Sequence, residues 1–283
     1  MNSSIQACLQ EHGKSLQAAL GIDISTARIE IQCLLQATLQ VARAYLYAHP
    51  EQTLSNEQQA TYLALLARRK QGEPIAYLVG RREFYGLDFK VTTATLIPRA
   101  DTELLVEQAL QRIPMQQNCD VLDMGTGSGA IALSIAHARP QARVVAIDAS
   151  PDALQVASDN QHSLGVANVS LLLSNWFEAL SGRRFDVIVS NPPYIAAGDV
   201  HLSQGDVKFE PPNALTSGAD GLLDIRYICS RSMQFLKPGA WLMLEHGYNQ
   251  ASVVREILQQ AGLKRVYSVR DIAGIERVSG GSA

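Results

Sequence analysis

The chain has 283 residues, of which 47% are hydrophobic and 18% are charged, and its formal net charge is −3. These values are ordinary for a globular protein with one large domain or two smaller ones. They exclude a transmembrane protein, because no apolar run approaches the roughly 20 residues that a membrane-spanning helix needs. Residues 1–20 also lack the pattern of a cleaved signal peptide, and the four cysteines show no metal-ligand spacing. We therefore expect a cytoplasmic protein without a metal site.

Residues 1–73 are expected to form a small all-α domain. Apolar residues recur at spacings of three and four, which is typical of helices with one buried face. The stretches with this character are residues 4–20, 26–40, 42–49 and 56–70. Ser55, with Gln58 three residues later, predicts a capping box at the start of the last one. The basic residues 68–70 suit a solvated helix C-terminus.

Residues 74–100 are expected to be a linker that contains a β-hairpin. The segment 83–91, EFYGLDFKV, has strand-forming residues on both sides of Gly86, which predicts a turn there. The stretch 101–112, DTELLVEQALQR, has the spacing of an amphipathic helix, and Asp101 is its expected N-cap.

Residues 101–283 alternate between strands and helices. Seven strands are predicted, at residues 119–124, 143–148, 169–173, 185–190, 240–247, 264–271 and 276–281. Helices are predicted between them at residues 130–139, 151–165, 221–236 and 251–262. This alternation, together with continuous apolar strands, indicates an α/β domain whose mostly parallel sheet is covered on both faces.

A glycine-rich segment follows the first of these strands. Residues 123–130 read DMGTGSGA, and Gly125, Gly127 and Ala130 fit the dinucleotide fingerprint G-x-G-x-x-G/A, with Asp148 about 20 residues further on. Glycines let the backbone approach a ligand at a helix N-terminus, and an acid at the end of the next strand can accept hydrogen bonds from ribose hydroxyls. The loop alone therefore indicates a nucleoside ligand, and it leaves an NAD-dependent dehydrogenase open. Its continuous D-x-G-x-G-x-G spacing resembles motif I of class I S-adenosyl-L-methionine (AdoMet)-dependent methyltransferases more closely.

A rigid turn follows the fourth strand, where residues 189–194 read VSNPPY. Two prolines cannot continue a central strand, because neither donates an N–H and both have a fixed φ. A planar amino group is a poor nucleophile, since its lone pair is delocalised. The Asn191 side-chain oxygen and the Pro192 carbonyl could accept one N–H each and align that lone pair. Tyr194 could stack on the planar group near the developing charge. The turn therefore predicts an amino-methyltransferase that works through positioning and electrostatics.

Several further motifs carry a more specific resemblance. The segments GEPIAYLVGRREFYGLDFKV, LIPRADTELLVE, DMGTGSGAIAL, VSNPPYI, VKFEPPNAL, LEHG and the closing ERV occur in that order. Together they resemble, close to full length, the peptide chain release factor N5-glutamine methyltransferases (the PrmC/HemK family). The resemblance implies a Rossmann-like class I fold with a seven-stranded sheet behind a small helical substrate-docking domain. It also implies methyl transfer from AdoMet to the glutamine of the Gly-Gly-Gln motif in release factors.

The resemblance also assigns site residues. Those implied to bind AdoMet are Gly125, Thr126, Gly127, Ser128, Gly129, Asp148, Trp176 and Asn191. The substrate carboxamide is implied to lie against Asn191, Pro192, Pro193 and Tyr194, with Asn191 and Tyr194 as the catalytic pair. The chain departs from the family pattern at Asn175, where many relatives have Asp, and at Ala100, where Pro is common. We expect weaker cofactor binding at most from the first departure.

Two further alternatives remain open at this point. A nucleic-acid methyltransferase acting on adenine N6 or guanine N2 can share the Asn-Pro-Pro-Tyr turn, but it predicts a basic cleft with room for a flipped base. A non-catalytic adapter is disfavoured because no motif is broken. We expect a monomer without a direct nucleic-acid partner.

Overall fold

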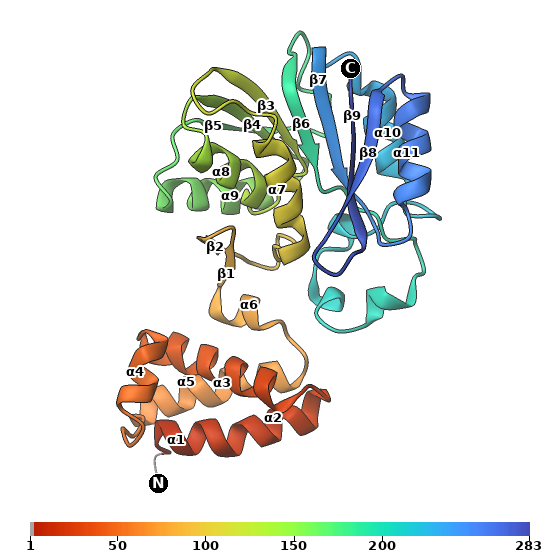
Figure 1. The fold of residues 1–283 in the computed structure, drawn as a ribbon. Helices are drawn as coiled ribbons and strands as arrows, with labels where there is room; N and C mark the ends of the chain where they lie inside the picture. The colour runs from red at the N-terminus through yellow and green to blue at the C-terminus, as the bar shows by residue number, and fades with distance from the viewer. Residues whose placement is uncertain (1–2) are drawn as a thin grey trace. The chain divides into compact units, whose positions relative to one another are not determined.

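The computed structural model describes residues 3–283, which fall into two compact units. One unit comprises the chain up to Arg81 together with Gln204–Phe209, and the other comprises Arg82–Ser203 and Glu210–Ala283. Figure 1 shows helices alone in the first unit, apart from the start of the hairpin, and a sheet flanked by helices in the second. The segment Gln204–Phe209 thus belongs to the helical unit although it lies far from it in sequence. Among the described residues, no helix is long and apolar enough to cross a membrane.

The helical unit is built from the amphipathic stretches predicted above. Its helices are α1 (Ile5–Ala7), α2 (Gly13–Leu20), α3 (Ile24–Leu39), α4 (Arg43–Ala48), α5 (Asn56–Lys70) and α6 (Ile75–Val79), with a π-helical turn at Cys8–His12 between α1 and α2. Their apolar faces bury a common core that includes Leu16, Ile31, Leu35 and Tyr62. The capping box of Ser55 and Gln58 is confirmed at the start of α5. Helix α6 was not predicted, because only five residues separate its flanking Pro74 and Gly80.

The basic end of α5 is not simply solvated. Arg69 is only 7% exposed, and its guanidinium forms two hydrogen bonds to the Glu30 carboxylate, at 2.7 and 2.9 Å. Its Nη1 atom also lies 3.5 Å from Asp206, in the segment that joins the helical unit from afar. A buried guanidinium needs such partners, since an unpaired charge is costly to bury. The expectation of a solvated helix end is therefore wrong for Arg69.

The predicted hairpin is confirmed. Strands β1 (Arg81–Phe84) and β2 (Leu87–Lys90) are joined by Tyr85 and Gly86, whose φ angles are 52° and 74°. Two consecutive residues with positive φ give a type I′ turn, which matches the twist of the flanking strands.

The second unit contains a seven-stranded sheet with the order β5-β4-β3-β6-β7-β9-β8. Its strands are β3 (Cys119–Met124), β4 (Ala142–Asp148), β5 (Val169–Leu173), β6 (Phe185–Ser190), β7 (Leu236–Glu245), β8 (Lys264–Arg270) and β9 (Glu276–Ser282). Neighbouring strands from β5 to β7 pair in parallel, whereas β9 is antiparallel to both β7 and β8. The predicted mostly parallel sheet is thus confirmed.

Helices cover both faces of this sheet (Figure 1). They are α7 (Glu103–Leu110), α8 (Ala130–Ala138), α9 (Pro151–Ser163), α10 (Leu223–Ser232) and α11 (Ala251–Gln260). Val121 and Val187 face one core layer, with α7 and α8, while Leu122 and Ile188 face the other, with α10 and α11. Successive strand residues point to opposite faces, so strands buried on both faces read as continuous apolar runs.

Several boundaries differ from the sequence prediction. Asp101 is not the N-cap of a helix: it lies inside a 3₁₀ turn, Ala100–Thr102, and α7 follows from Glu103 without a side-chain cap. Strand β7 begins at Leu236 rather than at residue 240, and α10 ends earlier, at Ser232. Leu236 pairs with Phe185 across a register irregularity, which lets Pro238 and Gly239 lie within the strand.

Candidate active site

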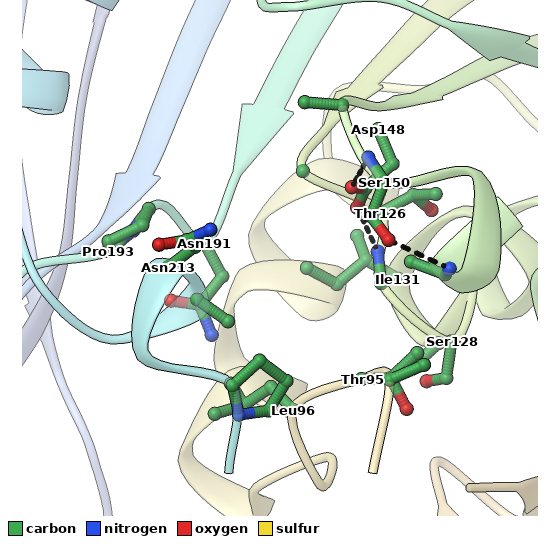
Figure 2. A pocket seen from close by; sticks show the side chains of 18 of the residues that line it. Thr95, Leu96, Thr126, Ser128, Ile131, Asp148, Ser150, Asn191, Pro193 and Asn213 are labelled. Carbon is green, nitrogen blue, oxygen red and sulfur yellow. Dashed lines mark hydrogen bonds between the residues drawn. The ribbon is translucent and has the colours of Figure 1, made fainter. Parts of the chain in front are cut away.

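The carboxyl ends of β3, β4 and β6 meet at one edge of the sheet. In open α/β sheets, ligands bind outside this edge, where the strand order reverses. A pocket of about 490 Å³ lies there, within the second unit. Figure 2 shows Asn191, Pro193 and Asn213 on one side of it and Thr126, Asp148 and Ser150 on the other.

The glycine loop between β3 and α8 forms one wall of the pocket. Gly125, Gly127 and Gly129 have φ angles of 72°, 56° and 82°, a region that side chains disfavour. A Cβ at Gly129 would lie 2.8 Å from Cδ1 of Leu133 and 3.3 Å from Cβ of Ala157. Gly129 does not line the pocket. Close packing of α8 therefore accounts for Gly129, whereas Gly125 and Gly127 border the pocket itself.

Asp148, at the end of β4, holds this loop. Its Oδ2 atom accepts a hydrogen bond from the Gly127 amide at 2.9 Å, and its Oδ1 accepts one from the Ser150 amide at 2.9 Å. The same carboxylate lines the pocket, and each carboxylate oxygen can accept more than one hydrogen bond. Asp148 can therefore fix the loop and still accept hydrogen bonds from a ligand.

Two buried polar residues behind the loop were not predicted to have a role. Asp123 accepts a hydrogen bond from the Thr126 hydroxyl at 2.7 Å, and burial raises the pKa of its carboxyl to about 7. Asn160 donates to the Ser128 carbonyl at 2.8 Å and accepts from the Lys90 amide at 2.7 Å. It thereby ties the glycine loop to β2. A fully buried Asn within a helix has no distinguishing sequence signal, because α9 reads as a solvated amphipathic helix.

The turn after β6 is fixed from several directions. Ser190 donates its hydroxyl to the Met124 carbonyl at 2.7 Å, which couples the ends of β3 and β6. Asn191 donates from Nδ2 to the Thr102 hydroxyl at 3.2 Å. The Tyr194 hydroxyl donates to Oε1 of Glu245 at 3.2 Å, and the Tyr194 carbonyl accepts from the Gln250 amide group at 3.0 Å. The turn therefore has little freedom to move.

Segments that precede α7 and follow Phe209 complete the pocket. Thr95, Leu96, Pro98 and Arg99 line it from one segment, and Pro211, Asn213 and Ala214 line it from the other. Glu210 joins the two: its buried carboxylate accepts a hydrogen bond from the Ile97 amide at 2.9 Å and pairs with Arg99. This contact brings together the motifs LIPRADTELLVE and VKFEPPNAL, which lie far apart in the sequence.

The structure brings most of the predicted site residues to one pocket. Those that line it are Gly125, Thr126, Gly127, Ser128, Asp148, Trp176, Asn191 and Pro193. Gly129, Pro192 and Tyr194 are not among the lining residues. Trp176 has a φ of 49°, and its ring lies 3.9 Å from the position that a Cβ would take on Gly125. Its ring thus borders the same end of the pocket as the glycine loop.

This fold and pocket define a Rossmann-like methyltransferase. A family model described as methyltransferase small domain matches residues 100–211, and one described as PrmC N-terminal domain matches residues 8–80. The fold resembles that of a methyltransferase from Pyrococcus furiosus, with a TM-score of 0.53 and 17% identity over 76% of this chain and 96% of that chain.

Similarity to curated proteins identifies the family of methyltransferases to which the chain belongs. A release factor glutamine methyltransferase of Salmonella typhimurium is 49% identical over 92% of this chain and 93% of its own length. One of Escherichia coli K12 is 45% identical over 97% of both chains. The chain belongs to the release factor glutamine methyltransferase family.

Proposed function

We propose that this enzyme transfers a methyl group from AdoMet to the side-chain amide nitrogen, N5, of the glutamine in the Gly-Gly-Gln motif of release factors. The observation that carries the proposal is the hydrogen bonding of the Asn191 side-chain amide. The side-chain nitrogen of Asn191 donates to Thr102, whereas its side-chain oxygen accepts no hydrogen bond from any residue among 3–283, and Asn191 lines the pocket. An unoccupied acceptor on a rigid turn suits a substrate amide.

The residues around the pocket fit AdoMet. Gly125 and Gly127 allow close approach of the backbone, Asp148 offers acceptors to ribose hydroxyls, and the Trp176 ring offers a surface on which adenine can stack. Thr126, Ser128 and Gly129 complete the loop in this proposal. When bound, AdoMet supplies an electrophilic methyl group on a sulfonium. Asn175, which also lines the pocket, can still accept a hydrogen bond from adenine through its side-chain oxygen.

The chain itself has to orient a weakly nucleophilic nitrogen. In this proposal Asn191 Oδ1 accepts one N–H of the glutamine amide and the Pro192 carbonyl accepts the other. Pro193 lies against the carboxamide. Tyr194, which the sequence predicted to stack on the carboxamide, is not among the residues that line the pocket, and in this proposal it shapes that surface from behind the turn. Two fixed acceptors align the nitrogen lone pair with the methyl group, so the rate gain comes from positioning and electrostatics. The amide proton leaves to solvent after the methyl group has moved, and no general base is required.

The organisation of the chain suggests a division of labour. We propose that residues 1–73 dock the release factor, that residues 74–100 link the domains and that residues 101–283 bind AdoMet and perform the transfer. We further propose that the enzyme is cytoplasmic, because release factors act in translation. We also propose that it is a monomer without a direct nucleic-acid partner.

Methylation with labelled AdoMet tests the function directly. Purified release factor should incorporate one methyl group at the Gly-Gly-Gln glutamine, and a release factor in which that glutamine is replaced by alanine should incorporate none. Labelling of duplex DNA or structured RNA, without labelling of the release factor, would support the nucleic-acid alternative instead.

A further inference from the structure

Glu245 is a buried carboxyl group that none of the proposed steps uses. It ends β7, is 2% exposed and is paired across the sheet with Val278 of β9. Its Oε1 atom accepts the Tyr194 hydroxyl at 3.2 Å, but its Oε2 has no hydrogen-bond partner of ordinary geometry among residues 3–283. A buried acceptor without a partner costs roughly 1–3 kcal/mol, so such a group calls for an explanation.

Thr102 interacts with this carboxyl and has a hydroxyl hydrogen that it can donate. It is 4% exposed, and its Oγ1 accepts the Asn191 amide hydrogen at 3.2 Å. Its own hydroxyl hydrogen has no other acceptor among the described residues, and its interaction with Glu245 lowers the pKa of that carboxyl. The spare hydrogen of Thr102 and the spare acceptor of Glu245 are therefore complementary, and a small adjustment of either side chain would pair them.

This chain of contacts has a direction. An ionised carboxylate can only accept hydrogen bonds, and a hydroxyl has a single hydrogen. If Thr102 donates that hydrogen to Glu245, it can only accept from Asn191. Asn191 must then turn its NH₂ group toward Thr102, which leaves its oxygen free for a ligand.

We propose that Glu245 and Thr102 are positioning residues that hold the Asn191 amide with its oxygen toward the substrate and anchor the Tyr194 side chain at the other end of the same turn. The role rests on the proposed function of Asn191 as an acceptor for the glutamine amide. It links two ends of the Asn-Pro-Pro-Tyr turn through one carboxylate.

Protonation of the Glu245 carboxyl should make the orientation of the Asn191 amide depend on pH. The pKa of Glu245 is raised to about 7, mainly by burial and also by the charge of Asp101, while Thr102, Tyr194 and the charge of Arg277 act in the opposite direction. Arg277, on β9, is itself paired with Asp101 at 3.3 Å. Once protonated, the carboxyl can donate to Thr102, which can then donate to the Asn191 oxygen and turn the amide the wrong way. The rate of methyl transfer should therefore fall as the pH drops below about 7.

Two substitutions separate this role from simple packing. Thr102→Val keeps the shape but removes the hydroxyl, and we expect kcat at saturating AdoMet to fall about 10- to 100-fold, as for a misplaced catalytic group. Thr102→Ser, which restores the hydroxyl, should recover most of the rate. Glu245→Gln presents an NH₂ group in place of an acceptor, so its kcat should be low and should not change between about pH 6 and 8. The AdoMet affinity of all three variants should fall much less than kcat.

The wild-type enzyme provides the first readout, because its pH profile requires no variant to fold. A wild-type kcat that stays constant from pH 6 to 8, or a Thr102→Val enzyme with wild-type kcat, would overturn the proposal. So would a Glu245→Gln enzyme that keeps the wild-type pH dependence. Glu276→Gln serves as the control, since Glu276 lies on β9 of the same sheet, pairs with Arg255 of α11 and lies outside the turn. If the wild-type enzyme fails to methylate the release factor at all, the proposed function fails, which is a different result from an intact activity that ignores these two residues.

Discussion

The Asp148 carboxylate accepts a hydrogen bond from the backbone N–H of Gly127 at 2.9 Å, so the acid at the end of β4 fixes the glycine loop after β3. In the proposed function the same carboxylate also accepts hydrogen bonds from the ribose of AdoMet. Charge-assisted hydrogen bonds are stronger than neutral ones, and removing the acceptor leaves the loop amide without its partner.

Asp148→Ala should therefore weaken AdoMet binding by about 1.5–3 kcal/mol, measured by calorimetry. Asp152→Ala is a suitable control, because Asp152 is exposed in the first turn of α9 and does not line the pocket. Unchanged affinity in a folded Asp148 variant would remove Asp148 from the cofactor site.

Gly221 should prove necessary for the conformation of the Asn-Pro-Pro-Tyr turn after β6. A Cβ there would lie 2.3 Å from the Tyr194 carbonyl oxygen, whereas a Cβ at Gly239 would meet nothing within 4 Å, and both glycines have positive φ. Gly239→Ala should therefore show only the cost of the backbone conformation, about 1 kcal/mol of unfolding free energy. Gly221→Ala should lose more stability in denaturant unfolding and also lower kcat, because the turn has to move. Equal stability losses and equal kcat in the two variants would show that the turn tolerates the displacement.

Asp123 should make stability depend on pH. Burial raises the pKa of its carboxyl to about 7, above the value in the unfolded chain, so the folded state holds the proton more tightly. Its contribution is full below about pH 4 and is lost as the pH rises through about 7. In Asp123→Asn this dependence disappears. The unfolding free energy of the wild type, measured relative to the variant, should therefore decline between about pH 4 and 7; a constant difference would contradict the assignment.

The helical unit should matter for the protein substrate and not for the cofactor. The pocket is lined only by residues of the second unit. Removal of residues 1–73 should leave AdoMet affinity unchanged, which calorimetry can establish first. Methylation of an intact release factor should then fall while that of a short Gly-Gly-Gln peptide should not. Equal rates of the truncated and full-length enzymes on the release factor would rule out a docking role.

The sequence predicted the parts of the site that consist of backbone shape. Gly125 and Gly127 permit positive φ angles, and Pro192 and Pro193 fix φ, so both patterns can be recognised from the sequence without knowledge of the fold. The strands were also predicted, apart from the bounds of β7, because neighbouring residues such as Val121 and Leu122 are buried on opposite faces of the sheet and give continuous apolar runs. Contacts that depend on distant parts of the chain were not predicted. Examples are the Glu210 contact with Ile97 and the Asn160 contact with Ser128. A buried Asn or Glu has the same one-letter signature as an exposed one.

The two wrong predictions about helix ends, at Asp101 and Arg69, have a related cause. Asp101 has the residue type of an N-cap, but the chain tightens into a 3₁₀ turn that brings Thr102 under Asn191. Tertiary contacts at the pocket thus override the local capping preference. Arg69 likewise has the sequence position of a solvated helix end, and only the fold shows that Glu30 lies opposite.

Single-turnover methyl transfer by Asn191 variants tests the central claim most directly. Asn191→Ala removes one of the two proposed acceptors and leaves both prolines, so transfer at saturating AdoMet should slow about 10²- to 10³-fold. Asn191→Asp keeps an oxygen but adds a negative charge beside the sulfonium. It should bind AdoMet at least as well as Asn191→Ala and still transfer slowly, because the charge stabilises the bound cation more than the charge-dispersed transition state. Near-normal transfer by the Asn191→Ala enzyme would show that the amide does not position the substrate nitrogen, and it would contradict the mechanism.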